Sequence, residues 1–289
     1  MHLNNCQLNE LCQLAAHAAT LAGQMIAQRS QENFKVGSKT AGSSLASQVL
    51  TEVDVASEQL IINTLNPTLK QYDLALLSEE TPDDQQRFIK DYFWCIDPLD
   101  GTLPFTEQQP GYAVSIALVA KDGTSQIGVI YDPTTSNLYT AIKGSGAFKN
   151  DKPLKINSNQ KAITLVCDRS FLHDQRFEQV KSKLSALSAN KLNIISHGGA
   201  AMNAIWVLEN HPAVYFKFPK KQAGGGSLWD YAASNCIFNE LSAPSTDYEG
   251  KQLKLNRKDT TFMNKEGIFY CSSTRLSNTI KEAILQLDQ

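Results

Sequence analysis

The chain has 289 residues, of which 42% are hydrophobic, enough for a sizeable core in one large domain or two modest lobes. Its formal net charge of −2 argues against a nucleic-acid polymer or a membrane surface as a partner. An anionic ligand would therefore be held by local positive charge, from a few lysine or arginine side chains or from metal ions.

The N-terminal segment and the cysteines indicate the compartment. No Lys or Arg precedes Arg29, and Leu8, Leu11 and Leu14 recur at helical spacing between polar residues, so we expect an amphipathic helix and no signal peptide. No segment offers the roughly 18 consecutive apolar residues of a membrane span. The six cysteines are scattered without a CxxC pair, which favours buried free thiols over disulfides or a zinc site. We therefore expect a cytoplasmic protein.

The next elements follow from hydrophobic spacing and turn residues. The Gly/Ser-rich segment 36–48 predicts an exposed loop. Residues 51–65 predict a helix. We expect its buried face to consist of Val53, Ala56, Leu60, Ile61 and Leu65. Short strands are predicted at 74–78 and 92–96, and Pro98, which lacks a backbone donor, should end the second.

The rest of the chain divides into a hairpin region and an alternating region. The segments 111–123 and 125–133 predict an antiparallel pair of strands joined at Asp122-Gly123, and 137–144 predicts another strand. Beyond residue 160, strands and helices alternate, with strands at 162–168, 191–196, 213–218 and 267–273 and helices at 173–189, 200–210, 227–241 and 276–287. Hairpins followed by alternation favour a layered α/β sandwich over a single doubly wound sheet. We place a boundary between an N-terminal lobe, 1–155, and a C-terminal lobe, 156–289.

Acidic residues gather where the strand at 92–96 ends, in the stretch WCIDPLDGT. Asp97 and Asp100, with Leu99 between them, could turn two carboxylates and a carbonyl inward, an all-oxygen set that suits Mg²⁺. Gly101 and Thr102 are expected to begin a helix whose first N–H groups could bind an anion beside the metal. A turn with helix-capping aspartates is the alternative explanation.

Other acidic residues stand at predicted element ends. Glu79 and Glu80 follow the strand at 74–78, Asp54 lies in the first turn of a predicted helix, and Asp230 follows Trp229 at the start of another. Taken singly, Asp54 and Asp230 are explained as charges that a helix dipole favours.

The segments LLSEE, WCIDPLDGT and WDYAA, in this order, resemble the inositol monophosphatase family. This family comprises lithium-sensitive, Mg²⁺-dependent phosphomonoesterases, with bisphosphate nucleotidases among its relatives. The resemblance extends over residues 51–273 and implies an α-β-α-β-α sandwich. DPLDGT combined with WD is its most specific part.

The resemblance also implies roles for individual residues. Glu79, Asp97 and the Leu99 carbonyl would hold one Mg²⁺, and Asp97, Asp100 and Asp230 a second, with a third, weaker ion near Glu79. Thr102 and Asp54 would orient the attacking water. The implied phosphate- or substrate-binding residues are Gly101, Thr102, Gly198, Gly199 and Lys217. No histidine, serine or cysteine nucleophile is required.

The metal ligands match the family, whereas the substrate side departs from it. Leu103 and Gly199 replace more usual residues, and the segment 216–230 is basic and glycine-rich. Its lysines, Lys217, Lys220 and Lys221, would either meet a second phosphate or form a solvated turn. We expect hydrolysis of an inositol or sugar monophosphate, with a 3′(2′),5′-bisphosphate nucleotide as the alternative substrate and a non-catalytic metal- and phosphate-binding relative as the second alternative. A homodimer is an open expectation.

Overall fold

The computed structural model describes residues 3–30, 36–38, 49–156, 161–188 and 191–284. Residues 39–48 of the predicted loop lie outside these ranges. Its first three residues form a strand instead of a loop, because β1 (Val36–Ser38) pairs antiparallel with β2 (Val49–Thr51). None of the helices in the described ranges combines the length and the hydropathy needed to cross a membrane. All six cysteines are described and free, and all except Cys6 are buried, as expected.

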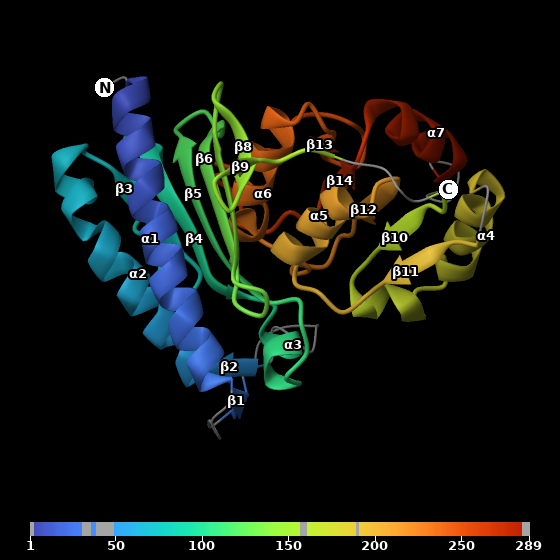
Figure 1. The fold of residues 1–289 in the computed structure, drawn as a ribbon, viewed down its shortest axis with the longest axis horizontal. Coiled ribbons are helices and arrows are strands. Elements are labelled where there is room, and N and C mark those ends of the chain that lie inside the picture. The colour runs from blue at the N-terminus through green and yellow to red at the C-terminus, as the bar shows by residue number, and fades with distance from the viewer. Residues whose placement is uncertain (1–2, 31–35, 39–48, 157–160, 189–190, 285–289) are drawn as a thin grey trace.

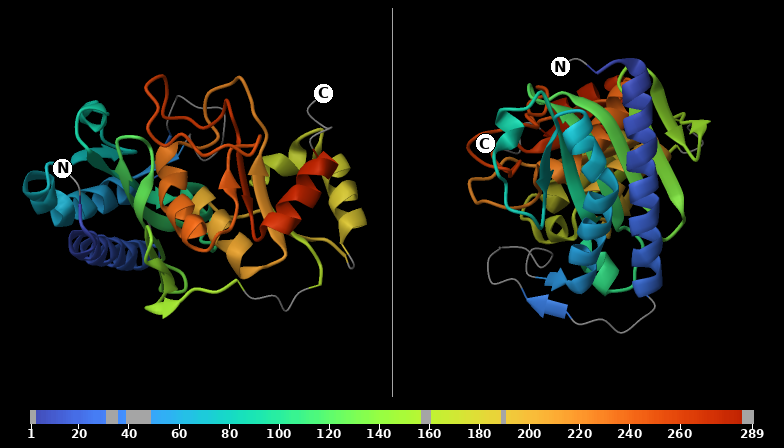
Figure 2. Two further views of the ribbon diagram at one scale, coloured as in Figure 1. Left: turned by 90° about the horizontal axis from the view of Figure 1, so that it is seen from above. Right: turned by 90° about the vertical axis from the view of Figure 1, so that its left-hand side faces the viewer.

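Helices and sheets alternate as layers across the molecule (Figures 1 and 2). Two long helices, α1 and α2, cover one face of a large sheet, α5 and α6 lie between this sheet and a smaller one, and α4 and α7 cover the outer face of the smaller sheet. The layer order is α-β-α-β-α, so the predicted architecture is confirmed. The helices are α1 (Asn5–Arg29), α2 (Glu52–Gln71), α3 (Thr102–Thr106), α4 (Phe177–Leu187), α5 (Ala200–Glu209), α6 (Leu228–Glu240) and α7 (Thr274–Ile284), with 3₁₀ turns η2 (Gln86–Phe88) and η3 (Arg169–His173).

The large sheet contains seven strands among the described residues, in the order β3-β4-β5-β6-β7-β8-β9. β3 and β4 are parallel and the other neighbours antiparallel, including the predicted hairpin of β5 and β6. The strands are β3 (Ala75–Ser78), β4 (Tyr92–Asp100), β5 (Ala113–Ala120), β6 (Ser125–Asp132), β7 (Asn137–Ile142), β8 (Gly146–Lys149) and β9 (Lys152–Pro153).

The described strands of the smaller sheet are ordered β11-β10-β12-β14-β13. β10, β11 and β12 are parallel, and β14 joins them antiparallel. The strands are β10 (Thr164–Val166), β11 (Asn193–Ile195), β12 (Ala213–Lys217), β13 (Ser245–Thr246) and β14 (Ile268–Cys271).

Strand alternation explains how one sheet serves two cores. In β4, Trp94 and Ile96 face α1 and α2, whereas Phe93 and Cys95 face the layer of α5 and α6. A third cluster packs the smaller sheet against α4 and α7. Because β4 is buried on both faces, its sequence reads as a continuous apolar run.

Two details close to the acidic residues also differ from the sequence-based expectations. β4 does not end before Pro98 but continues to Asp100, because a bulge between Asp97 and Asp100 lets pairing with β5 resume beyond the proline. In α2, Ala56 is exposed and Leu60 half-buried, whereas Asp54, Ser57 and Glu58 are buried. The inner face of α2 is therefore polar near its N-terminus.

The large and small sheets fall on either side of residue 155, where we place the lobe boundary. However, α6 belongs to the C-terminal half and packs on β5 and β6 of the large sheet. One hydrophobic cluster extends continuously from β5 through α6 to β14. The division into two lobes therefore stays an interpretation, while the arrangement brings residues from both halves to one site.

Candidate active site

The bulge at the end of β4 places two carboxylates in the interior. Asp97 pairs with Ser115 and Asp100 with Ala113, so β4 has one residue more than β5 between the two pairs. Asp97 and Asp100 are only 1% and 5% exposed, respectively. Asp97 Oδ1 accepts the Leu99 N–H at 3.1 Å, which tightens the loop.

Asp100 joins the large sheet to the start of α5. Its two carboxylate oxygens accept the N–H groups of Ala200 at 3.0 Å and Ala201 at 2.7 Å. A Cβ atom on Gly199 would lie 2.5 Å from an Asp100 oxygen, so this close approach depends on glycine. The Gly199 N–H is itself donated to the Gly111 carbonyl at 2.7 Å.

Asp230 comes from the first turn of α6 and completes an acidic cluster. Its carboxylate accepts the Ser227 N–H in a capping box. Asp97, Asp100 and Asp230 each offer a carboxylate oxygen, and these oxygens all lie within 4.8 Å of one another. This set of hard oxygen donors suits a divalent cation such as Mg²⁺.

The electrostatics of the three carboxyl groups also fit a cation. Burial, followed by the charges of Glu79, Asp100 and Asp230, raises the pKa of Asp97 well above its usual range. Burial and the charge of Asp230 raise the pKa of Asp100 to about 8, against two N–H donors that lower it. Burial also raises the pKa of Asp230. Bound positive charge would relieve this repulsion.

Glu79 reaches the same region from the neighbouring strand. The parallel register aligns Ser78 with Ile96, and the Glu79 N–H is donated to the Ile96 carbonyl at 3.2 Å. Glu79 is exposed, and its charge contributes to the raised pKa of Asp97. It therefore lies at the solvent side of the cluster, outside the 4.8 Å group.

The start of α3 follows the bulge directly. Gly101 has a φ of +88°, which only glycine adopts readily, and turns the chain into the short helix that begins at Thr102. Thr102 Oγ1 lies 3.5 Å from the Leu99 carbonyl. Asp54 is buried in the first turn of α2, whose next turn contacts Pro98 through Ser57. The water-orienting roles of Asp54 and Thr102 stay predictions.

Gly198 is packed against α5 rather than open. A Cβ atom there would lie 2.5 Å from both Asn203 Oδ1 and a ring carbon of Trp206, and the Gly198 carbonyl accepts the Asn203 side-chain amide. Both Gly198 and Gly199 therefore support the start of α5 close to Asp100. Their assignment to substrate binding, like that of Gly101, stays a prediction.

Lys217 is held by an internal ion pair. Its ammonium group lies 2.7 Å from an Asp168 carboxylate oxygen and donates to the Gly225 carbonyl at 2.7 Å. Burial alone would lower the pKa of Lys217, but the charge of Asp168 and the hydrogen bonds with Asp168 and Tyr231 raise it above its usual range. Its positive charge in turn lowers the pKa of Asp230. Lys217 thus acts on the acidic cluster over a distance, and its contact with substrate stays a prediction.

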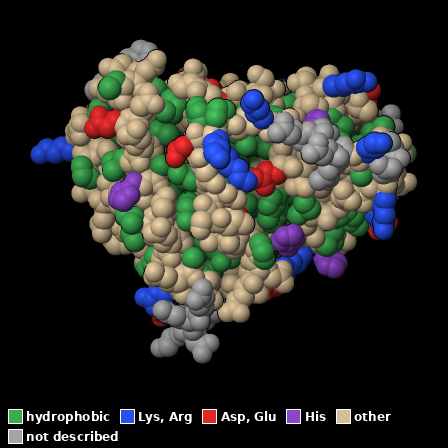
Figure 3. All heavy atoms as spheres, in the orientation of Figure 1, with side chains coloured by type: hydrophobic (Ala, Val, Ile, Leu, Met, Phe, Trp, Pro, Cys, Tyr) green, Lys and Arg blue, Asp and Glu red, His purple; other side chains and the backbone are tan. Residues whose placement is uncertain are grey.

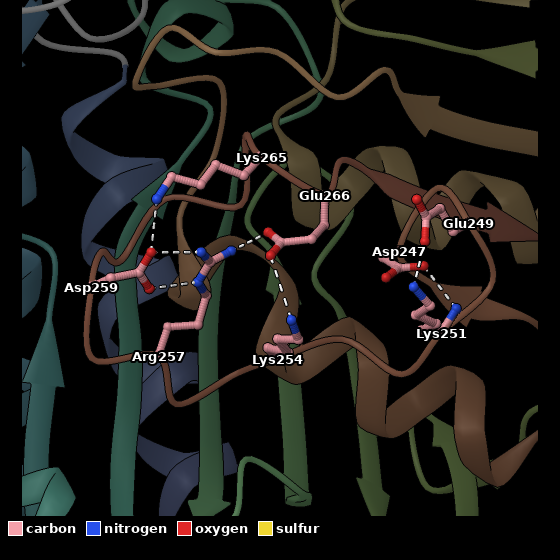
Figure 4. Close-up of polar contacts among 8 residues, drawn as sticks. All are labelled: Asp247, Glu249, Lys251, Lys254, Arg257, Asp259, Lys265 and Glu266. Carbon is pink, nitrogen blue, oxygen red and sulfur yellow. Dashed lines mark hydrogen bonds and ion pairs between the residues drawn. The ribbon is translucent and has the colours of Figure 1, made fainter. Parts of the chain in front are cut away.

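A long loop after β13 supports the glycine-rich segment before α6. The Leu228 N–H is donated to the Thr261 carbonyl at 2.9 Å, and the Met263 N–H to the Gly226 carbonyl at 3.0 Å. Figure 4 shows the ion pairs that hold this loop, in which Arg257 lies between Asp259 and Glu266. Lys265 adds a 2.8 Å contact to Asp259. The segment that carries Asp230 is therefore held in place by this loop.

Three positions near the site were not singled out from the sequence. Ser57 and Glu58 on α2 contact the two acidic loops, which carry Asp97 and Glu79 respectively. Asp168 is the partner of Lys217. The spacing of Ser57 and Glu58 from Asp54, at i+3 and i+4, was an available signal for a shared helix face. No such signal pointed to Asp168, because its ion pair with Lys217 joins the ends of two different strands, β10 and β12.

The sequence matches the family described as "Inositol monophosphatase family" over residues 7–286. The chain belongs to this family. It is 30% identical over 249 residues to "Nus factor SuhB" of Haemophilus influenzae, covering 84% of this chain and 86% of that protein. It is 29% identical over 245 residues to "Inositol-1-monophosphatase" of Bacillus subtilis, covering 84% and 87%.

The fold also matches solved structures of the family. The inositol monophosphatase from Anabaena (Nostoc) superposes with a TM-score of 0.70 at 24% identity, covering 96% of each chain. This likeness supports the shared fold alone. The family resemblance read from the sequence is thus confirmed, and the buried acidic cluster lies on the DPLDGT and WD segments that carried it.

Proposed function

We propose that the protein is a Mg²⁺-dependent hydrolase of small phosphate monoesters. The observation that carries the proposal is the convergence of Asp97, Asp100 and Asp230, three largely buried carboxylates with oxygens within 4.8 Å and raised pKa values. Family membership supports the phosphatase class. Such a cluster without a cation would be costly, and a cation there would lie beside the start of α3.

The residues divide into holding and orienting roles. Glu79, Asp97 and the Leu99 carbonyl would hold one Mg²⁺, and Asp97, Asp100 and Asp230 another. When bound, Mg²⁺ would polarise water and neutralise charge on the phosphoryl group.

The other groups of the chain would orient the reactants. Asp54 and Thr102 would hold the attacking water through their carboxylate and hydroxyl, with the proton passing toward Asp54. Backbone N–H groups at Gly101 and Thr102 would bind phosphate oxygens.

The substrate we favour is an inositol or sugar monophosphate, in keeping with the Bacillus subtilis relative named "Inositol-1-monophosphatase". A small metabolite fits the surface better than a polymer, since acidic and basic side chains are interspersed on the face in Figure 3. Several relatives are named Nus factors, so a non-catalytic role is the alternative that an assay must address.

One observation favours a bisphosphate nucleotide as a second candidate. The Lys220 residue is exposed as a whole, while its amine is partly covered, and this partial burial together with the charge of Lys217 lowers the pKa of Lys220. Among the described residues Lys217 forms an ion pair with Asp168, whereas Lys220 has no carboxylate partner, so its charge is not balanced by an ion pair. A second phosphate on the substrate would balance it.

A substrate panel tests the proposal. Phosphate release would be measured with Mg²⁺ and with EDTA, on inositol-1-phosphate, a sugar monophosphate and 3′-phosphoadenosine-5′-phosphate. We expect Mg²⁺-dependent release from at least one substrate and its loss in the Asp230→Asn variant. Binding of Mg²⁺ without release from any substrate would favour the non-catalytic alternative.

A further inference from the structure

Two buried polar side chains of α2 have no role in the proposed function and contact both acidic loops. Ser57 and Glu58 are 0% and 7% exposed and follow Asp54 by three and four residues, so the three share one face of the helix. This face packs against β4, the strand that ends in the bulge. Polar side chains in such a position require hydrogen-bonding partners.

Ser57 fixes the Pro98–Leu99 peptide unit, which is hydrogen-bonded to the Asp97 side chain. Its hydroxyl donates to the Pro98 carbonyl at 2.7 Å. The same peptide unit carries the Leu99 N–H, which donates to Asp97 Oδ1 at 3.1 Å. Because a peptide unit is planar, holding its oxygen from α2 also sets the direction of its N–H. Pro98 and Leu99 have no paired residue on β5, so Ser57 replaces a contact that the sheet does not provide.

Glu58 fixes the turn that carries Glu79. Its two carboxylate oxygens accept the Glu80 N–H at 3.2 Å and the Thr81 hydroxyl at 3.0 Å. A further buried carboxylate beside an acidic cluster is electrostatically unfavourable. Its two hydrogen bonds give the physical reason for its presence: it is an acceptor that orders the turn after β3.

We propose that Ser57 and Glu58 are positioning residues. They hold the loops at 97–100 (DPLD) and 78–81 (SEET) in fixed relative positions, so that Glu79, Asp97 and the Leu99 carbonyl converge before a cation binds. The inference rests on the metal site of the proposed function. One rigid helix connects two loops that are 18 residues apart in sequence from Glu79 to Asp97, and hydrogen bonds to ligand-bearing groups commonly set metal affinity.

The affinity for Mg²⁺ alone, measured by isothermal titration calorimetry on the metal-free protein, tests this inference. We expect Ser57→Ala and Glu58→Met to weaken binding by about tenfold. Glu58→Gln keeps an acceptor for the Glu80 N–H and a partner for Thr81, so it should stay within about threefold of the wild type. Should Ser57→Ala fail to fold, the similarly sized Met and Gln variants still carry the test.

Thr68→Ala provides the matched control. Thr68 is another buried hydroxyl on α2, and it accepts the Trp94 indole N–H at 2.9 Å, on β4 but away from the loops. Its loss should lower the melting temperature and leave Mg²⁺ affinity unchanged. Unchanged affinity in Ser57→Ala and Glu58→Met, equal losses in Glu58→Gln and Glu58→Met, or a matching loss in Thr68→Ala would each overturn the inference.

The outcomes for function and for positioning are separable. If the wild type binds Mg²⁺ but releases no phosphate, the proposed function is wrong, and the affinity series still decides the role of Ser57 and Glu58. If the wild type does not bind Mg²⁺ at all, both are overturned.

Discussion

Among the three clustered carboxyl groups, Asp97 has a pKa raised by burial and by the charges of three neighbouring carboxylates, and the proposed function assigns it to both metal ions. The metal-free fold therefore loses stability as the pH rises from the ordinary carboxyl range up to the raised pKa of Asp97. We expect Asp97→Asn to raise the melting temperature of the metal-free protein at pH 8 and to reduce phosphate release to near background. Thermal melts in EDTA and a phosphate assay measure the two effects. Near-normal turnover would contradict the assignment of Asp97 as a metal ligand.

Lys220 allows a test of specificity that Lys217 does not. Lys217 is paired with Asp168, so its replacement would leave that carboxylate with hydrogen bonds but without its cationic partner. Lys220→Gln should raise KM for a 3′,5′-bisphosphate nucleotide by about tenfold, the value of one charge-assisted hydrogen bond, and change KM for a monophosphate by less than about twofold. Lys152→Gln, at an exposed position on β9, is the control. Equal changes on both substrates would assign Lys220 to the solvated surface.

At the scale of elements, the sequence predicts best where one periodicity dominates. The apolar run of β4 and the hairpin of β5 and β6 were correctly predicted. The length of β4 was not, because Pro98 excludes ordinary pairing but not a bulge. The inner face of α2 was predicted only in part: Val53, Ile61 and Leu65 are buried as expected. Ser57 and Glu58 were missed because burial was assigned to apolar residues only, and their hydrogen-bonding partners lie 22 to 41 residues away in sequence. Such partners leave no local pattern.

The start of α5 gives a prediction at the same scale. Gly199 has an ordinary φ of −66°, so alanine suits its backbone, but the new Cβ would lie 2.5 Å from the Asp100 carboxylate. Gly199→Ala should therefore displace Asp100 and weaken Mg²⁺ binding by about tenfold or more. Gly144→Ala is the contrast, since its φ of +79° costs stability while its Cβ would meet nothing within 4 Å. Equal Mg²⁺ affinity in both variants would show that Asp100 adjusts freely.

For the whole molecule, the site lies where separate layers of the sandwich meet. Asp97 and Asp100 come from the large sheet, and Asp230 from a helix between the sheets. Asp100 also caps α5, and the Arg169–Glu107 ion pair, at 2.7 Å, joins η3 to the end of α3 nearby. The DPLDGT and WD segments pointed to the three carboxylates that the structure brings together, whereas the joining contacts depend on how the layers pack.

A cation bound to this cluster should therefore stabilise segments from both halves of the chain. We expect Mg²⁺ to slow hydrogen–deuterium exchange at the end of β4 and at the starts of α5 and α6, and to leave α4 and α7 unchanged, because they lie on the outer face of the smaller sheet (Figure 1). At about 100 times its Kd, one bound ion adds roughly 2.7 kcal/mol to the stability, so the melting temperature should rise as well. In Asp97→Asn both effects should disappear. Protection confined to β4 would show that Asp230 does not share the cation with Asp97 and Asp100.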